Sequence, residues 1–297
     1  MGVSFLVTSV ISGLLVAAGG MFYVLLLGIA VLGLSVVHLA LVRVEERPEG
    51  TTPDAESTDP QPKQNKVDLR GTLLVVRGVP GLLALIAFSC FNNFLAGVFM
   101  ALMDAYGLSL MSVQAWGLLW GALSAGFILG GLAVAKTGLG KSPVRLLLLI
   151  NIVLWSVTCL FPLQSSVILL TAGMAVYMVS MPYAEAAEQT ILQRVVPFER
   201  QGRVFGFAQS VELAASPLTA FLIGPITQLI FIPFMTTGAG VELIGGWFGT
   251  GPDRGIAVVF VLTGIIGLCV TALALRSRPY RELSGQYASR LELVTAS

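Results

Sequence analysis

The segment EAAEQTILQRVVPFERQGRVFG, residues 185–206, stands between two long apolar runs. SSVILLTAGMAVYMVSMPYA (165–184) precedes it and FAQSVELAASPLTAFLIGP (207–225) follows it. The polar segment itself holds three glutamates, three arginines, three glutamines and a proline. Three interpretations are open for such a segment: an active site, a nucleotide-binding loop, or a hairpin between two membrane spans. The composition and the charge pattern of the whole chain distinguish them.

The composition excludes a water-soluble protein. Of the 297 residues, 56% are hydrophobic and only 11% are charged, whereas soluble domains carry about 25% charged residues. Too little polar surface is present to cover a soluble globule, so we expect the lipid bilayer to be the solvent. The 17 basic residues are dispersed and do not alternate with exposed aromatic residues, so the sequence gives no indication of a nucleic-acid partner.

The apolar runs have the length of transmembrane helices. A helix needs roughly 17 to 25 mostly apolar residues to cross the hydrocarbon core, and the runs neither alternate nor are short enough for strands. The sequence therefore predicts an all-α membrane protein with eight spans, namely Gly2–Ala18, Met21–Val42, Val79–Met103, Val113–Ala135, Val144–Phe161, Ser165–Tyr183, Val204–Phe231 and Ile256–Leu275.

The positions of the basic residues predict the orientation of these spans. When the loops are numbered alternately, 16 of the 17 basic residues fall on the side of the 43–78 loop, and Arg254 alone falls on the other side. Cytoplasmic loops of membrane proteins are enriched in Lys and Arg. We therefore expect both termini in the cytoplasm, and segment 185–206 becomes a cytosolic hairpin between the sixth and seventh spans.

A polar linker divides the chain. VEERPEGTTPDAESTDPQPKQNKVDLR (44–70) is rich in Pro, Glu, Asp and Thr and has almost nothing to bury, which is typical of a flexible linker. The leucines and valines that follow it, with an arginine on either side, predict a short interfacial helix. The expected organisation is two spans in 1–42, a cytosolic linker with that helix in 43–78, six spans in 79–276 and a cytosolic tail in 277–297.

The residues that usually build metal or catalytic sites are scattered. Cys90, Cys159 and Cys269 each stand alone in an apolar run, as does His38, the single histidine. These cysteines are typical of small hydrophobic residues, and one histidine without a cysteine pair does not make a zinc site. With no Ser/His/Asp set available either, we expect no enzyme, no metal and no cofactor.

Polar side chains inside the spans predict the functional path. Gln209, Glu212, Ser216 and Thr219 recur every three or four residues and so share one helix face. Asn92 and Asn93 share a face of the third span with Ser89, and Tyr177 lies in the sixth. Hydrogen bonding between helices is the simpler explanation for the hydroxyl residues. An acid, interpreted as the only one well inside a span, and a double amide more often line an aqueous path. The predicted substrate and proton pathway therefore comprises Asn92, Asn93, Tyr177, Gln209 and Glu212.

A family resemblance rests on the opening segment. QTILQRVVPFERQGRVFG (189–206), followed by SPLTAFLIGPI (216–226), resembles the hairpin between helices ten and eleven of the major facilitator superfamily. The closest branch is the bacterial drug:proton antiporter type that includes macrolide-efflux proteins and the enterobactin exporter. The resemblance implies that the eight spans correspond to helices 5–12 of that fold and that helices one to four are missing. It also implies a cytosolic gate in the hairpin, with the expected residues Glu185, Glu188, Gln193, Arg194, Pro197, Gln201, Gly202 and Arg203.

The resemblance implies a secondary active transporter in the plasma (inner) membrane. Its expected activity is efflux of a small, partly apolar compound by alternating access, with protons as the coupling ion. The expected partners are thus a small-molecule substrate, protons and the lipid bilayer. The alternative is a truncated membrane fragment that transports nothing, or a longer transporter whose start is misassigned.

Overall fold

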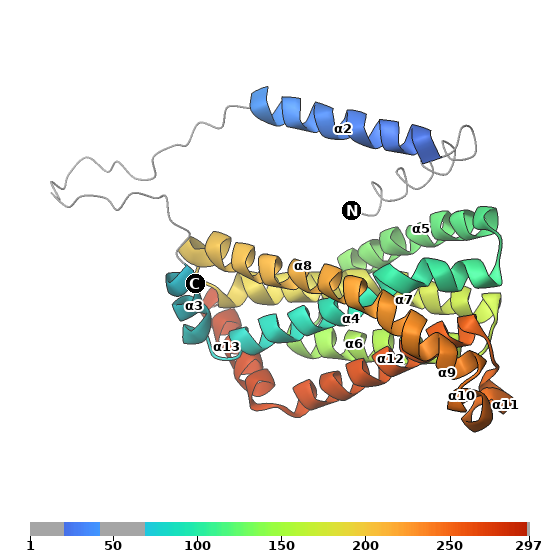
Figure 1. Cartoon of the computed structure of the whole chain (residues 1–297). Coiled ribbons are helices and arrows are strands. Elements are labelled where there is room, and N and C mark those ends of the chain that lie inside the picture. Colours follow the sequence, from blue (N-terminus) through green and yellow to red (C-terminus); the bar gives the residue numbers. More distant parts are fainter. Residues whose placement is uncertain (1–20, 42–68, 296–297) are drawn as a thin grey trace, which may run out of the picture. The chain divides into compact units, whose positions relative to one another are not determined.

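A computed structural model describes residues 21–41 and 69–295, and all regular structure in these two ranges is helical (Figure 1). The first range is a single helix, α2 (Met21–Leu41), which forms a unit separate from the rest. Its 21 residues correspond to about 31 Å of helix at 1.5 Å per residue. That length suffices to cross a bilayer.

The second range is built from six long helices. They are α4 (Leu82–Leu110), α5 (Val113–Thr137), α6 (Pro143–Leu160), α7 (Val167–Val195), α8 (Gln201–Ile226) and α12 (Pro252–Arg276). With α2, the described residues contain seven helices that are long and apolar enough to span a membrane. The predicted all-α membrane fold is confirmed, and the eighth expected span, Gly2–Ala18, lies outside the described residues.

Shorter helices cover the two ends of this bundle (Figure 1). α3 (Leu69–Gly78) and α13 (Arg278–Thr295) lie at one end. We call it the basic end, because the expected cytosolic loops, which carry 16 of the 17 basic residues, lie there. After α8, a π-helical turn (Thr227–Phe231) leads to α9 (Ile232–Thr236), α10 (Ala239–Leu243) and α11 (Gly245–Phe248) at the opposite end. A 3-10 turn (Phe161–Leu163) follows α6, and another (Phe198–Arg200) precedes α8.

The six long helices pack with an internal symmetry. α4 packs along α8 as α7 packs along α5, α6 contacts α7 as α12 contacts α4, and α6 packs along α12. Exchanging α4 with α7, α5 with α8 and α6 with α12 reproduces this set of contacts. α4 starts at the basic end and α7 ends there, so the two halves of the symmetry run in opposite directions. This is the arrangement of two inverted three-helix repeats.

Glycines allow the closest of these helix contacts. A Cβ atom on Gly97 of α4 would collide with the backbone oxygen of Ser216 on α8. A Cβ atom on Gly130 of α5 would collide in the same way with Val179 of α7. Membrane helices commonly use small residues to bring their backbones together. Here the α4–α8 pair and the symmetry-related α5–α7 pair each have a glycine at the close contact.

α7 is longer than the sequence predicted. The apolar run was expected to end at Tyr183, but the helix continues to Val195. Buried Ala184, Ala187, Ile191 and Val195 recur every three or four residues and hold this part of the helix against its neighbours. The polar residues between them lie on the other faces of the same helix, which lowered the hydropathy without ending the helix.

Candidate functional site

A polar cavity of about 350 Å³ opens between α4, α6, α7 and α8. All five residues predicted for the pathway line it: Asn92, Asn93, Tyr177, Gln209 and Glu212. The helical spacing that put Gln209 and Glu212 on one face explains why both point into the same space. Ser89, Asn151, Glu185, Glu188 and Gln189 complete its polar lining.

Glu188 lies in a helix and lines the polar cavity, a position that was not predicted from the sequence. It was expected in a cytosolic gate, and Glu212 was interpreted as the only acid well inside a span. Because α7 continues past Tyr183, Glu188 and Glu185 are helical residues that line the polar cavity. The spacing of Ala184, Ala187 and Ile191 could have predicted this longer helix. These residues continue an apolar helix face past Tyr183, where the hydropathy of the sequence falls.

Two carboxyl groups and a hydroxyl group meet in this cavity. Ser89 Oγ donates a hydrogen bond to Oε1 of Glu188, and Glu212 lines the same cavity, close enough to Glu188 for the two carboxyl groups to interact electrostatically. Oε1 of Glu212 is buried and has no hydrogen-bond donor among the described residues. The described residues that line the cavity include no Lys, Arg or His. The two acids therefore face each other without a neutralising cation in the lining.

The two asparagines of α4 differ in their contacts. Trp155 Nε1 on α6 donates a hydrogen bond of 2.9 Å to Oδ1 of Asn92, whose Nδ2 donates to the Phe88 carbonyl at 3.0 Å. Asn92 therefore links two helices. Such hydrogen bonding between helices was the alternative to a place in the substrate and proton pathway. Asn93 Nδ2 donates to the Ser89 carbonyl of its own helix at 3.1 Å.

The turn between α7 and α8 is shorter than the hairpin expected in segment 185–206. The turn itself runs from Val196 through Arg200, with Pro197 preceding the 3-10 turn. Gln201, together with Gly202 and Arg203, starts α8. Gln201 Nε2 donates to the Gln193 carbonyl at 2.7 Å and to the Val196 carbonyl at 3.2 Å, which ties the start of α8 to the end of α7.

The last turn of α7 is also tied to α13. The Arg194 guanidinium lies 5.3 Å from the centre of the Tyr287 ring, a cation–π contact. Tyr287 and Leu283 of α13 are buried against the bundle. The turn at the basic end is thus connected to the carboxy-terminal helix.

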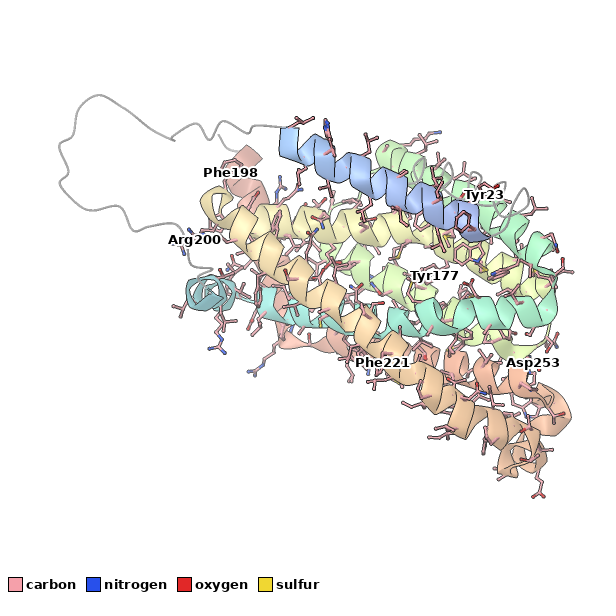
Figure 2. All side chains as sticks on the ribbon, turned by 45° about the horizontal axis from the view of Figure 1, so that its top comes forward. Tyr23, Tyr177, Phe198, Arg200, Phe221 and Asp253 are labelled. Atoms are coloured by element: carbon pink, nitrogen blue, oxygen red, sulfur yellow. The ribbon has the colours of Figure 1, made fainter. Side chains whose placement is uncertain are left out.

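A second, mostly apolar cavity of about 510 Å³ adjoins the polar one. Asn93, Ala96, Tyr177 and Met181 line both cavities. In Figure 2, Tyr177 lies between the end that carries Phe198 and Arg200 and the end that carries Asp253. This cavity could not be predicted from the sequence, because its aromatic and methionine side chains have the composition of an ordinary helix-packing core.

Comparison with known proteins identifies the family of the chain. A family model described as "Major Facilitator Superfamily" matches residues 1–220, about three quarters of the 297 residues. No curated protein and no solved structure gives a match. The matched residues include both Glu188 and Glu212. The chain belongs to the major facilitator superfamily, a family of multi-pass membrane transporters.

Proposed function

We propose that this protein exports a small, partly apolar compound in exchange for protons, by alternating access. The observation that carries the proposal is the Glu188–Glu212 pair in a polar cavity that adjoins an apolar one. One cavity offers groups that can hold a proton, and the other offers a surface suited to an apolar molecule. The family membership supports transport itself, and the pair supports the choice of protons.

The electrostatics of the pair favour a bound proton. Two ionised carboxylates side by side repel each other, and sharing one proton removes the repulsion. Acids inside membrane spans commonly serve as proton relays. Here Ser89 donates to Glu188 and supports the charge that remains after one proton has bound.

The packing suggests how the proton is released. Glu212 lies on α8, which packs along α4, whereas Glu188 lies on α7, which packs along α5. A movement of the α4–α8 pair relative to the α5–α7 pair would separate Glu188 from both Glu212 and Ser89. The shared proton would then lose one of its two acceptors. In this proposal Asn93, Tyr177 and Gln209 line the path along which the proton and the substrate pass.

The charge distribution supports an orientation. Because the basic residues gather on the side of α3 and α13, we place that end in the cytoplasm, with the protein in the plasma (inner) membrane. The turn between α7 and α8 then faces the cytosol. Its connections to α8 and α13 suit the cytosolic gate that the sequence suggested for Gln193, Arg194 and Pro197.

Transport by the full chain in liposomes tests the proposal. Ethidium movement and internal pH are followed together, with an imposed proton gradient. We expect wild-type protein to couple the two movements, and E188Q and E212Q to reduce proton movement at least about tenfold while inserting normally. E242Q is the matched control, because Glu242 lies in α10 at the opposite end, away from both cavities.

The possible outcomes separate the alternatives. Unchanged proton coupling in both glutamine variants would remove the pair from the mechanism. A wild-type chain that inserts normally but moves neither ethidium nor protons would support the alternative of a non-transporting fragment.

A further inference from the structure

We propose that the apolar cavity is a binding site for organic cations with a flat aromatic body, and that Asp104 anchors their charge. This inference rests on the proposed function, because it names the class of compound that would be exported. The inference can still be tested by ligand binding alone, without measuring transport. None of these roles was assigned to Asp104 or to the apolar cavity from the sequence.

The walls of the cavity suit a flat aromatic molecule. Phe99, Phe161 and Tyr177 line it with their rings close together. The Phe99 ring centre lies 5.5 Å from that of Tyr177 and 6.4 Å from that of Phe161. Methionines 100, 103, 174, 178 and 181 fill much of the remaining wall. Methionine side chains are flexible and polarisable, and surfaces rich in them adapt to ligands of different shape.

Asp104 gives this cavity its charge. It lies on α4 about six residues before the helix ends at Leu110, and it is the only Asp, Glu, Lys, Arg or His in the described lining. A carboxylate beside aromatic rings favours a cation in two ways, by direct charge attraction and by cation–π contact with the ring faces. An anionic ligand would be repelled, and a neutral one would lack the direct charge attraction to Asp104.

The carboxylate is held in position by its neighbours. Trp116 Nε1 on α5 donates a hydrogen bond of 2.9 Å to Asp104 Oδ1. The Trp116 ring packs flat on Gly107, where any side chain would collide with it, and its centre lies 5.8 Å from that of Trp120. Trp120 lines the cavity. A carboxylate has two acceptor oxygens, so the bond from Trp116 orients Asp104 and leaves capacity for a ligand.

The size and position of the cavity fit the proposal. Its volume of about 510 Å³ lies in the range of pockets that enclose drug-sized molecules. It shares Asn93, Tyr177 and Met181 with the cavity of the carboxyl pair. A bound ligand would therefore border the polar cavity, whereas Asp104 itself lies about 22 Å farther along α4 than Ser89, the partner of Glu188.

Equilibrium binding to the full-length protein in detergent tests the site. Ethidium is the cationic probe and phenylnaphthylamine the neutral one, and both are measured by fluorescence titration. We expect D104N to weaken ethidium binding about tenfold or more, which corresponds to about 1.4 kcal/mol. Phenylnaphthylamine binding should change little. Asparagine keeps an oxygen that can accept from Trp116, so folding should be preserved.

Two further variants make the outcomes decisive. A96F places a ring where the two cavities meet, and it should weaken both probes together. E242Q removes an acid that does not line the cavity, and it should leave both unchanged. The proposal is overturned if D104N binds ethidium as tightly as wild type, or if it weakens both probes equally. The proposed function can fail separately, because E188Q and E212Q should retain ethidium binding even where proton movement is lost.

Discussion

The indole nitrogen of Trp155 on α6 donates a hydrogen bond of 2.9 Å to the side-chain oxygen of Asn92 on α4. Trp155 is buried, with only 3% of its surface exposed, so its N–H group has little access to water. A buried donor that loses its partner is costly. Asn92 therefore contributes to the assembly of the helices as well as to the wall of the polar cavity.

Replacing this acceptor should lower stability. We expect Asn92→Leu to destabilise the protein by about 1–3 kcal/mol, because the Trp155 N–H is left without a partner. Thermal unfolding in detergent measures the difference, with Asn93→Leu as the control, since Asn93 bonds only within its own helix in the described contacts. Equal loss at the two positions would contradict the assigned role.

A second prediction concerns the close approach of α4 and α8. Gly97→Val should destabilise the bundle by about 1–3 kcal/mol, because the added side chain has no room beside Ser216. Gly117→Val is the matched control, since a Cβ atom there meets nothing within 4 Å. The two variants can be compared by their unfolding temperature and by their yield in the membrane. A Gly97 variant as stable as the Gly117 variant would show that α4 and α8 can move apart at little cost.

Much of this architecture can be predicted from the sequence, because spans are set by local hydropathy. Hydropathy does not predict where α7 ends. Hydropathy falls after Tyr183, yet the helix continues because Ala187, Ile191 and Val195 still have an apolar surface to pack against. Whether such a surface exists depends on the other helices, so the position of Glu188 in the cavity could not be read from hydropathy alone.

Part of the candidate site can likewise be predicted from the sequence, and part depends on how the helices pack. The shared face of Gln209 and Glu212 follows from helical spacing, and both residues do line the polar cavity. The meeting of Glu212 with Glu188 depends on how α7 and α8 pack, as does the bond between Asp104 and Trp116 across two helices. Tertiary pairs of this kind have no signature in the spacing along one chain.

The proposed orientation gives a third prediction. In a variant without Cys90, Cys159 and Cys269, a cysteine at Ser289 should be protected from membrane-impermeant thiol reagents in intact cells. A cysteine at Thr250 should react, because it lies in the turn before α12 at the opposite end. Ser289 is exposed on α13, so protection there would reflect the membrane. Labelling at Ser289 with protection at Thr250 would reverse the orientation.

Arg254 gives the last prediction, and its contacts explain the single exception in the charge pattern. It lies in the first turn of α12 and is only 2% exposed. Its Nη2 donates to the Pro162 and Leu163 carbonyls at 2.6 and 3.1 Å, and its Nη1 donates to Ser165 Oγ at 2.9 Å. The accepting carbonyls follow the end of α6, where helix groups lack partners and favour a positive charge. Arg254 therefore fastens α12 to the turn between α6 and α7.

The flat face of the guanidinium is also covered, since its carbon lies 4.2 Å from the centre of the Phe248 ring. We expect Arg254→Met to destabilise the protein by about 2–5 kcal/mol, because it removes charge-assisted hydrogen bonds and leaves buried carbonyls unpaired. Arg254→Lys keeps the charge but not the forked donors, so its loss should be intermediate. Arg276→Met, at the exposed end of the same helix, should change stability by about 0.5 kcal/mol or less. Unfolding temperatures in detergent rank the three variants. If Arg254→Met unfolds at the same temperature as Arg276→Met, Arg254 does not fasten α12 in place.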